Sequence, residues 1–309
     1  MISEAYRAQV DLLLQVLPHT TKEESFALKG GTAINLFVRD MTRLSVDIDL
    51  TWLPFDDRDT SLSGIGDALR RVKERVEKNI ERSKVKLVPQ SDGQEAKLNI
   101  QTPAAQIKVE VNTLIRGSLF PTVRMRVAEA AETEFGRSAS ANVISHTELF
   151  GGKICAALDR QHPRDFFDIH HMLENEGLTE EIRMGFIELL LSGNRPIHEM
   201  IRPNFQDQKQ AFETQFAGMA FTPFSYADFE ATRKRLVQEI NQGWTDNDRA
   251  FLLSFKQGKP DWSLFPLENL SRMPAVQWKL LNIQKLKAQN PEKHTGQLNM
   301  LEEQLAISQ

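Results

Sequence analysis

Eight residues near the N-terminal end alternate strictly between polar and aliphatic side chains, reading RLSVDIDL over 43–50. Successive strand residues point to opposite faces, so this alternation predicts a strand with one buried face. The polar face then carries Arg43, Ser45, Asp47 and Asp49. Aspartate is poorly suited to strands, and two neighbouring carboxylates repel each other. The stretch therefore predicts an exposed sheet face that needs a compensating positive charge, for which a divalent metal ion is the natural candidate.

Composition narrows the class of protein. The chain has 309 residues, a formal net charge of -4 and a pI near 6.0, so any nucleic-acid partner must be held by a local basic patch. Its one cysteine, Cys155, excludes a disulfide framework and a cysteine zinc cluster. The N-terminal residues lack the apolar run of a signal peptide, and no stretch is apolar enough to span a membrane. We expect a cytoplasmic protein without a membrane partner.

The pattern of predicted elements changes along the chain. About the first 120 residues mix predicted strands and helices, whereas after about residue 145 strands almost vanish from the pattern. A small-residue stretch between 118 and 145 interrupts both patterns. The sequence therefore predicts an α+β fold, with a mixed sheet and flanking helices in residues 1–135 and a mostly helical domain in residues 136–309.

A double glycine precedes the two aspartates in the stretch FALKGGTAINLFVRD, 26–40. Glycines between a strand and a helix let backbone N–H groups approach an anion, and Thr32 would open the helix and add a hydroxyl donor. Magnesium is bound through one or two carboxylates together with substrate phosphates. Together, Gly30, Gly31 and the two aspartates indicate a metal–polyphosphate site, although a double glycine alone is usually a turn and two such aspartates alone are often a solvated strand face.

A third carboxylate lies in another alternating stretch, QIKVEVNTL at 106–114. Val109 and Val111 flank Glu110 as Val46 and Ile48 flank Asp47. On a neighbouring strand Glu110 would complete a carboxylate set for metal-assisted phosphoryl transfer.

The second set of candidate site residues lies in KICAALDRQHPRDFFD, 153–168. Lys153 stands in a helix of small and apolar residues, where a lysine either reaches solvent or contacts a phosphate. Asp165 and Asp168 are three residues apart, so they share a helix face. We predict a site at Lys153 with at least one of these aspartates. For Asp159, Arg160 and Arg164, a structural ion-pair network is an equally good interpretation.

Two basic stretches remain open to two interpretations each. The first runs over residues 70–86, where three glutamates favour a solvated helix over a binding surface. The second runs over residues 272–293 and contains Trp278 among lysines. Basic residues beside an aromatic ring could hold RNA, but an amphipathic packing helix explains the same pattern.

Two of these motifs resemble a known family. LKGGTAINLF with RLSVDIDLTW resembles the first motif of the DNA-polymerase-β-like nucleotidyltransferases, in the form found in the AbiEii/AbiGii toxins. ELFGGKICAALDRQHPRDFFDIHHML is similar to that family's second signature, and RMPAVQWKLLNIQKL to its C-terminal part. One departure is Thr32, since many polymerase-β-like enzymes have serine after the glycines.

The resemblance implies the toxin of a type IV toxin–antitoxin system, connected with abortive phage infection and partnered by a cognate antitoxin. It implies transfer of a nucleotide from a nucleoside triphosphate to RNA, specifically the tRNA 3′ end, with Mg²⁺ or Mn²⁺. A protein or small-molecule acceptor, or a silent nucleotide- or antitoxin-binding module, is the alternative. The implied metal ligands are Asp47 and Asp49, with Glu110 as our third candidate. The implied nucleotide-binding residues are Gly30, Gly31, Thr32, Ser45 and Lys153, to which we add Arg43. The predicted catalytic residues are Asp47, Asp49, Lys153, Asp165, Asp168 and Glu110.

Overall fold

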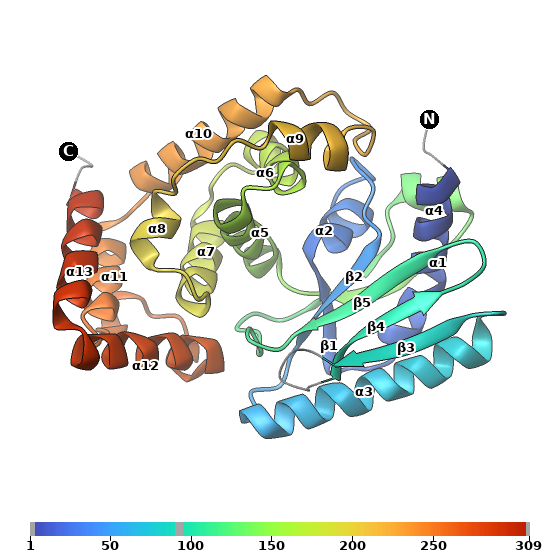
Figure 1. Cartoon of the computed structure of the whole chain (residues 1–309), viewed down its shortest axis with the longest axis horizontal. Helices are drawn as coiled ribbons and strands as arrows, with labels where there is room; N and C mark the ends of the chain where they lie inside the picture. Colours follow the sequence, from blue (N-terminus) through green and yellow to red (C-terminus); the bar gives the residue numbers. More distant parts are fainter. Residues whose placement is uncertain (1–3, 90–94, 307–309) are drawn as a thin grey trace. The chain divides into compact units, whose positions relative to one another are not determined.

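The computed structural model describes residues 4–89 and 95–306, and the chain divides into two compact units (Figure 1). Unit 1 consists of residues 1–145 and 217–223, and unit 2 of residues 146–216 and 224–309. The predicted α+β class is confirmed, with the strands in unit 1 and a helical unit 2. The division differs from the predicted boundary at 135/136 because residues 136–145 include a strand of the sheet.

In the described residues, unit 1 forms a seven-stranded mixed sheet in the order β3-β4-β5-β2-β1-β7-β6. The strands are β1 (Phe26–Lys29), β2 (Asp47–Trp52), β3 (Lys84–Pro89), β4 (Glu95–Gln101), β5 (Gln106–Asn112), β6 (Val123–Arg126) and β7 (Ser140–Val143). Strand β2 pairs with β5 in parallel and with β1 in antiparallel orientation. The sheet thus places β2, which carries the two aspartates, in its interior.

One face of this sheet is apolar and covered by helices. The alternation along β4, β5 and the first four residues of β2 buries one side chain in two, with Ile48, Leu98 and Val109 fully buried. Helices α1 (Glu4–Thr20) and α3 (Arg58–Asn79) pack against these strands and against each other. The short helix α4 (Glu129–Phe135) packs on α1. The opposite face of the central strands therefore carries their polar side chains.

Two predicted boundaries around the glycines are wrong. Strand β1 passes directly into helix α2 (Gly30–Ala33), which continues as a π-helical turn, η1 (Ile34–Val38). The helix thus begins at Gly30 instead of Thr32. Strand β2 begins at Asp47, although the alternation predicted a strand from residue 43.

The reason for the late start of β2 is a segment far away in the sequence. The Leu44 N–H donates to the carbonyl of Met219 at 2.9 Å, and the Phe221 N–H donates to the carbonyl of Thr42 at 2.9 Å. Residue 43 also forms an isolated antiparallel bridge with Ala220. Because residues 219–221 take up these backbone groups, residues 42–44 do not join the sheet.

Unit 2 is helical, and its described residues form no strand. Its α-helices are α5 (His146–Arg160), α6 (Pro163–Asn175), α7 (Glu180–Ser192), α8 (Ile197–Ile201), α9 (Lys209–Ala211), α10 (Tyr226–Gln242), α11 (Asp246–Lys256), α12 (Pro274–Gln289) and α13 (Pro291–Ala306). Shorter turns are η2 (Phe212–Phe216), η3 (Trp262–Leu264) and η4 (Leu270–Arg272). Helices α10 and α11 each begin with a capping box, at Ser225 and Thr245.

Helices α5 and α7 cross at two glycines. A Cβ on Gly151 would lie 2.3 Å from the carbonyl carbon of Gly185, and a Cβ on Gly185 would lie 2.1 Å from the carbonyl oxygen of Thr147. Only residues without a side chain allow the two backbones to approach so closely. This crossing holds α5, which carries Lys153, against α7.

The two basic stretches separate into parts with different surroundings. Within 70–86, Arg71 and Arg75 of α3 form ion pairs with Glu23, whereas Lys84 and Lys86 are exposed on β3. Both interpretations of the C-terminal stretch find support, as its residues divide between packing and exposure. Lys279 is buried and donates to the carbonyls of Leu190 and Arg195 at 2.8 and 2.7 Å. Trp278 is 48% exposed, with the ammonium of Lys285 lying 5.7 Å from its ring centroid.

Among the helices that the structure describes, none combines the length and the apolar character that crossing a membrane requires.

Candidate active site

Asp47 and Asp49 lie on the same side of β2. Both side chains are partly exposed, whereas Ile48 and Leu50 between and after them are buried. The strand pairs with β5 without a register shift over these residues, so the period of two is unbroken. The alternation in the sequence therefore predicted the common face of the two carboxylates correctly.

The double glycine lies against this side of β2. Gly30 has a φ of +72°, and a Cβ built on it would lie only 2.6 Å from Oδ2 of Asp49. A Cβ on Gly31 would lie 2.7 Å from Nη2 of Arg43 and 3.1 Å from Oγ of Ser45. Residues 30 and 31 must therefore lack a side chain, because polar atoms from residues 43–49 occupy the space beside them.

Thr32 holds the start of β2 in place. Its hydroxyl lies 2.5 Å from the carbonyl oxygen of Asp47 and 2.9 Å from Oγ of Ser45, and the residue is fully buried. A carbonyl can only accept, so the single hydroxyl hydrogen of Thr32 goes to Asp47, and Ser45 donates to Thr32. The predicted contact of Thr32 with a triphosphate stays a prediction, and the geometry gives this hydroxyl a positioning role.

The alternation predicted that Arg43 lies on the exposed face, but the structure buries it. Its side chain is 3% exposed, and Nη1 donates to the carbonyl of Leu44 at 2.8 Å. The prediction of exposure is wrong because residues 219–221 bond to residues 42–44 and take them out of the strand. Its guanidinium nevertheless lies beside Gly31, and its predicted role with a nucleotide stays a prediction.

Glu110 stands directly beside Asp49 in the register between β5 and β2. It forms an ion pair with Lys97 of β4, which is its partner in the next register pair. Within residues 4–89 and 95–306, no three His, Cys, Asp or Glu side chains are grouped so that they could hold a metal ion. Asp47 and Asp49 thus share one side of β2, and the role of Glu110 as a third metal ligand stays a prediction.

The pair by itself suits magnesium. This ion keeps several waters and is usually bound through one or two carboxylates plus substrate phosphates. Two carboxylates on one side of a strand, next to a glycine bend that leaves no room for a side chain, fit that donor set. Asp47 and Asp49 are thus the residues that would hold the ion.

The second set of predicted residues forms a buried ion-pair cluster in unit 2. The ammonium nitrogen of Lys153 lies 2.9 Å from Oδ1 of Asp165 and 2.9 Å from Oδ2 of Asp168. Arg160 adds two contacts to Asp165, at 2.6 Å from Nε and 2.9 Å from Nη2. Lys153, Asp165 and Asp168 are buried, and the exposed Arg160 contacts Asp165 from the surface of the unit. Burial alone would raise the pKa of Asp165, but Lys153 and Arg160 hold it well below its usual range.

A sharp elbow between α5 and α6 produces this cluster. Gln161 has a positive φ of 51°, His162 caps α6 by accepting from the Arg164 N–H, and Pro163 occupies the first helical turn. The elbow folds α6 back so that Asp165 and Asp168 face Lys153. Of the residues open to a structural interpretation, Arg160 is part of the cluster, and Asp159 forms an ion pair with Arg195 instead.

Two contacts of the site were not predicted from the sequence: the bond between Thr32 and Asp47, and the ion pair between Lys97 and Glu110. The bond between Thr32 and the carbonyl of Asp47 has no sequence signal, since it joins a side chain to the backbone 15 residues on. The pairing of Lys97 with Glu110 could have been anticipated, because both lie on the polar side of alternating strands.

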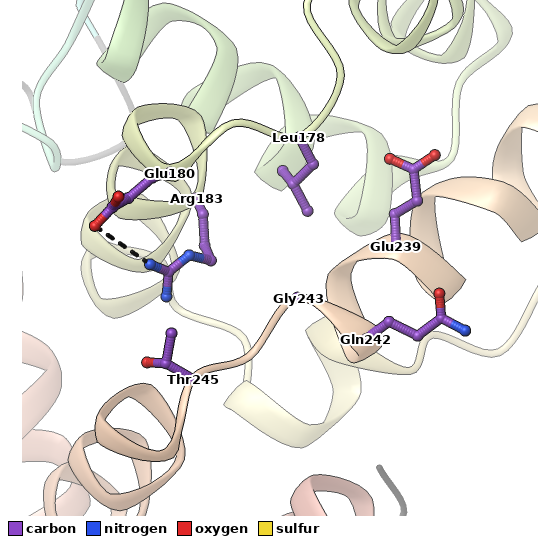
Figure 2. Close-up of a pocket in the computed structure, with 7 residues that line it drawn as sticks. All are labelled: Leu178, Glu180, Arg183, Glu239, Gln242, Gly243 and Thr245. Carbon is purple, nitrogen blue, oxygen red and sulfur yellow. Dashed lines mark ion pairs between the residues drawn. The ribbon is translucent and has the colours of Figure 1, made fainter. Parts of the chain in front are cut away.

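A pocket of about 480 Å³ lies elsewhere in unit 2 (Figure 2). Its lining residues are Leu178, Glu180, Arg183, Glu239, Gln242, Gly243 and Thr245. Figure 2 shows Arg183 turned toward Glu180, at 3.9 Å, and Arg183 is also paired with the buried Asp248. None of the predicted site residues lines this pocket, and its two carboxylates make it a poor complement to a polyphosphate.

The comparisons with known proteins agree with the two motifs. The family model described as nucleotidyl transferase AbiEii toxin, type IV toxin–antitoxin system, matches residues 11–282. Among solved structures the chain is similar to MenT4, a nucleotidyltransferase toxin from Mycobacterium tuberculosis H37Rv, with 15% identity and a TM-score of 0.62 over 91% of this chain and 94% of that chain. At that identity the likeness shows a common fold. No curated protein matches the sequence. Because the family model covers most of its length, the chain belongs to the AbiEii nucleotidyltransferase toxins of type IV toxin–antitoxin systems, and it is a nucleotidyltransferase.

Proposed function

We propose that this nucleotidyltransferase is a magnesium-dependent toxin that transfers a nucleoside monophosphate from a nucleoside triphosphate to RNA, at the 3′ end of tRNA, and thereby blocks translation or phage growth. The observation that carries the proposal is the carboxylate pair Asp47 and Asp49 on one side of β2, with Asp49 against the glycine bend. Manganese, with similar ligand preferences, would serve the same pair. A cognate antitoxin would restrain the activity in the cell.

The bound ion would neutralise negative charge on the triphosphate as the reaction proceeds. The residues of the chain supply the rest. Gly30 and Gly31 let the side chains of Asp49 and Arg43 lie against the backbone of the bend, next to which a phosphate group would bind. The ammonium nitrogen of Lys153 lies 2.9 Å from one carboxylate oxygen of each of Asp165 and Asp168, and its contact with a phosphate stays a prediction from the family resemblance.

In the transfer step the hydroxyl oxygen of the acceptor forms a bond to the α-phosphorus, and the bond from that phosphorus to the bridging oxygen breaks. Pyrophosphate leaves, and the hydroxyl proton passes to a base. Glu110 suits this role better than Asp168, because the Glu110 side chain is 45% exposed whereas that of Asp168 is fully buried against Lys153.

The experiment incubates the purified chain with each nucleoside triphosphate labelled at the α-phosphate, magnesium and total RNA. We expect the label in the tRNA fraction, its loss when the metal is chelated, and its loss in Asp49→Asn with an unchanged circular dichroism spectrum. Label on protein or a small molecule instead would favour the alternative acceptors. A complete absence of label from the wild-type chain, or a fully active Asp49→Asn, would contradict the proposal.

The toxin role has a separate test in cells. Expression of the wild-type chain should arrest growth, and Asp49→Asn should not. Co-expression of a short reading frame encoded directly upstream should restore growth. Growth arrest by both forms of the chain would show that toxicity does not depend on nucleotide transfer.

A further inference from the structure

The polar face of the sheet continues beyond the two aspartates, across three further strands. One row of register partners runs from Lys86 on β3 through Asn99 on β4 and Lys108 on β5 to Asp47 on β2. Partners in a sheet register point to the same side, so these four side chains share one face. At a spacing of about 4.8 Å between strands, Lys86 stands about 14 Å from Asp47.

The neighbouring rows extend the same surface. On one side Lys84 pairs with Gln101, which pairs with Gln106. On the other side Lys97, Glu110 and Asp49 follow one another. The intervening residues of β4 and β5 lie on the side of α1 and α3 and are buried. The polar rows form a surface on the other side, which we name the lysine face: Lys84, Lys86, Asn99, Gln101, Gln106 and Lys108.

The charge of the lysine face is not balanced. Lys84, Lys86 and Lys108 are exposed, and in the part of the chain that the structure describes none of them forms an ion pair with a carboxylate. Glu110, the acidic side chain nearest to Lys108 on β5, is neutralised by Lys97. A chain with a net charge of -4 thus presents three ammonium groups without an ion pair, of which Lys108 is the register partner of Asp47.

The lysine face also lacks the apolar centre of a protein–protein interface. The exposed large apolar side chains of the described residues are Phe55, Val123, Phe205, Phe221, Trp278, Leu281 and Met300, none of which lies on β3, β4 or β5. Fully buried centres of protein interfaces are rich in aromatic residues and poor in lysine. Ammonium groups interspersed with amides suit a phosphate backbone instead.

We infer that the lysine face binds the phosphate backbone of the nucleic-acid acceptor and leads its end to Asp47 and Asp49. The inference rests on the proposed function, because it assumes that the acceptor is RNA. The register supplies the geometry: Lys86 and Lys108 lie in the same row as Asp47, so a strand of RNA crossing β3 and β5 arrives at the carboxylate pair. The competing surface is α12, where exposed Trp278 lies beside Lys285.

The test removes the three charges together, as Lys84→Gln, Lys86→Gln and Lys108→Gln in one chain. A matched control removes three exposed lysines that lie off this face, Lys22→Gln, Lys78→Gln and Lys259→Gln. We expect the KM for RNA to rise at least about 10-fold in the first variant, with an unchanged KM for the nucleoside triphosphate. The slope of log binding constant against log salt should fall by about 2, from a loss of about 0.7 per phosphate contact to single-stranded RNA. Three arginines at 84, 86 and 108 should preserve binding.

The outcomes separate this inference from the proposed function. If the wild-type chain does not label RNA, the proposed function fails and the inference fails with it. If the wild-type chain labels RNA but the triple glutamine variant keeps its KM for RNA and its salt slope, the inference alone fails, and Lys84 and Lys86 serve only to protect the edge strand β3 from pairing. Loss of RNA binding in Trp278→Ala with Lys285→Gln, without loss in the triple variant, would move the RNA surface to α12.

Discussion

The carboxylate of Asp49 lies against the backbone of Gly30, at a separation that no other residue at position 30 would permit. A Cβ there would stand 2.6 Å from Oδ2 of Asp49, and Gly30 has a φ of +72°, in the left-handed region. The glycine bend and the acidic strand are therefore one structural unit, in which the shape of the bend determines where one of the two carboxylates can lie.

Gly30→Ala should lower both the unfolding free energy and the rate of nucleotide transfer. The left-handed conformation costs an L-residue about 1–2 kcal/mol. The new Cβ should also displace Asp49, and a shift of about 1 Å at a reacting group lowers the rate by about 100-fold. Steady-state nucleotide transfer and urea unfolding measure the two effects. The matched control is Gly152→Ala in α5, where a Cβ meets nothing within 4 Å and should be tolerated. An active Gly30→Ala chain would show that the position of Asp49 is not critical.

Thr32→Val should destabilise unit 1 because it removes the hydroxyl that bonds to the carbonyl of Asp47. A buried acceptor left without its partner costs about 1–3 kcal/mol. Thr32→Ser keeps the hydroxyl and should restore most of the stability and the transfer rate, as measured by urea unfolding and kcat. If valine and serine behaved alike in both measurements, the bond to Asp47 would have no positioning role.

Lys153→Met should be strongly destabilising as well as inactive. It removes the ammonium group that Asp165 and Asp168 share, while Arg160 still contacts Asp165, and breaking a buried ion pair costs about 3–5 kcal/mol. The double change Lys153→Met with Asp168→Asn removes one charge of each sign and should recover part of the unfolding free energy. Activity should stay absent in the double variant if Lys153 contacts phosphate, whereas recovered activity would make its role structural.

The same cluster predicts a loss of stability in acid. Although burial opposes ionisation, Lys153 and Arg160 hold the pKa of Asp165 below its ordinary value of 3.8. The stability from this ionised carboxylate is therefore fully present above pH 3.8 and is lost as the pH falls below it. Unfolding free energies measured from about pH 5 to about pH 2 should fall more steeply for the wild-type chain than for Asp165→Asn. Equal slopes would mean that Asp165 is not held ionised by the cluster.

Glu188→Gln should make the unfolding free energy of the protein less sensitive to rising pH. Burial first, and the neighbouring Glu148 second, raise the pKa of Glu188 well above 4.5. The stability linked to its neutral form is fully present below pH 4.5 and is lost as the pH rises through the raised pKa. Glutamine does not titrate, so the variant should lose less unfolding free energy than the wild-type chain between about pH 5 and about pH 8. Identical pH profiles would contradict the assignment of a neutral carboxyl at this position.

Local patterns in the sequence determined much of the site. The alternation of Asp47 and Asp49 with aliphatic residues was sufficient to predict that they share a face, because the side-chain period of a strand is a property of the backbone itself. Spacing likewise predicted that Asp165 and Asp168 lie on one side of a helix, and the structure shows both carboxylates against Lys153. The family followed from these same two motifs.

Only the tertiary structure decided which neighbours these residues meet. Residues 219–221 withdraw Arg43 from the strand, and Lys97 engages Glu110, which the sequence assigned to the metal. The lysine face exists because β3, β4, β5 and β2 pair in one particular register. Strand register and burial come from contacts between segments far apart in the chain, and shifting one strand by a single residue would turn all its side chains to the other face. Periodicity within a segment is therefore readable from the sequence, whereas the partners of each side chain become known only when the chain has folded.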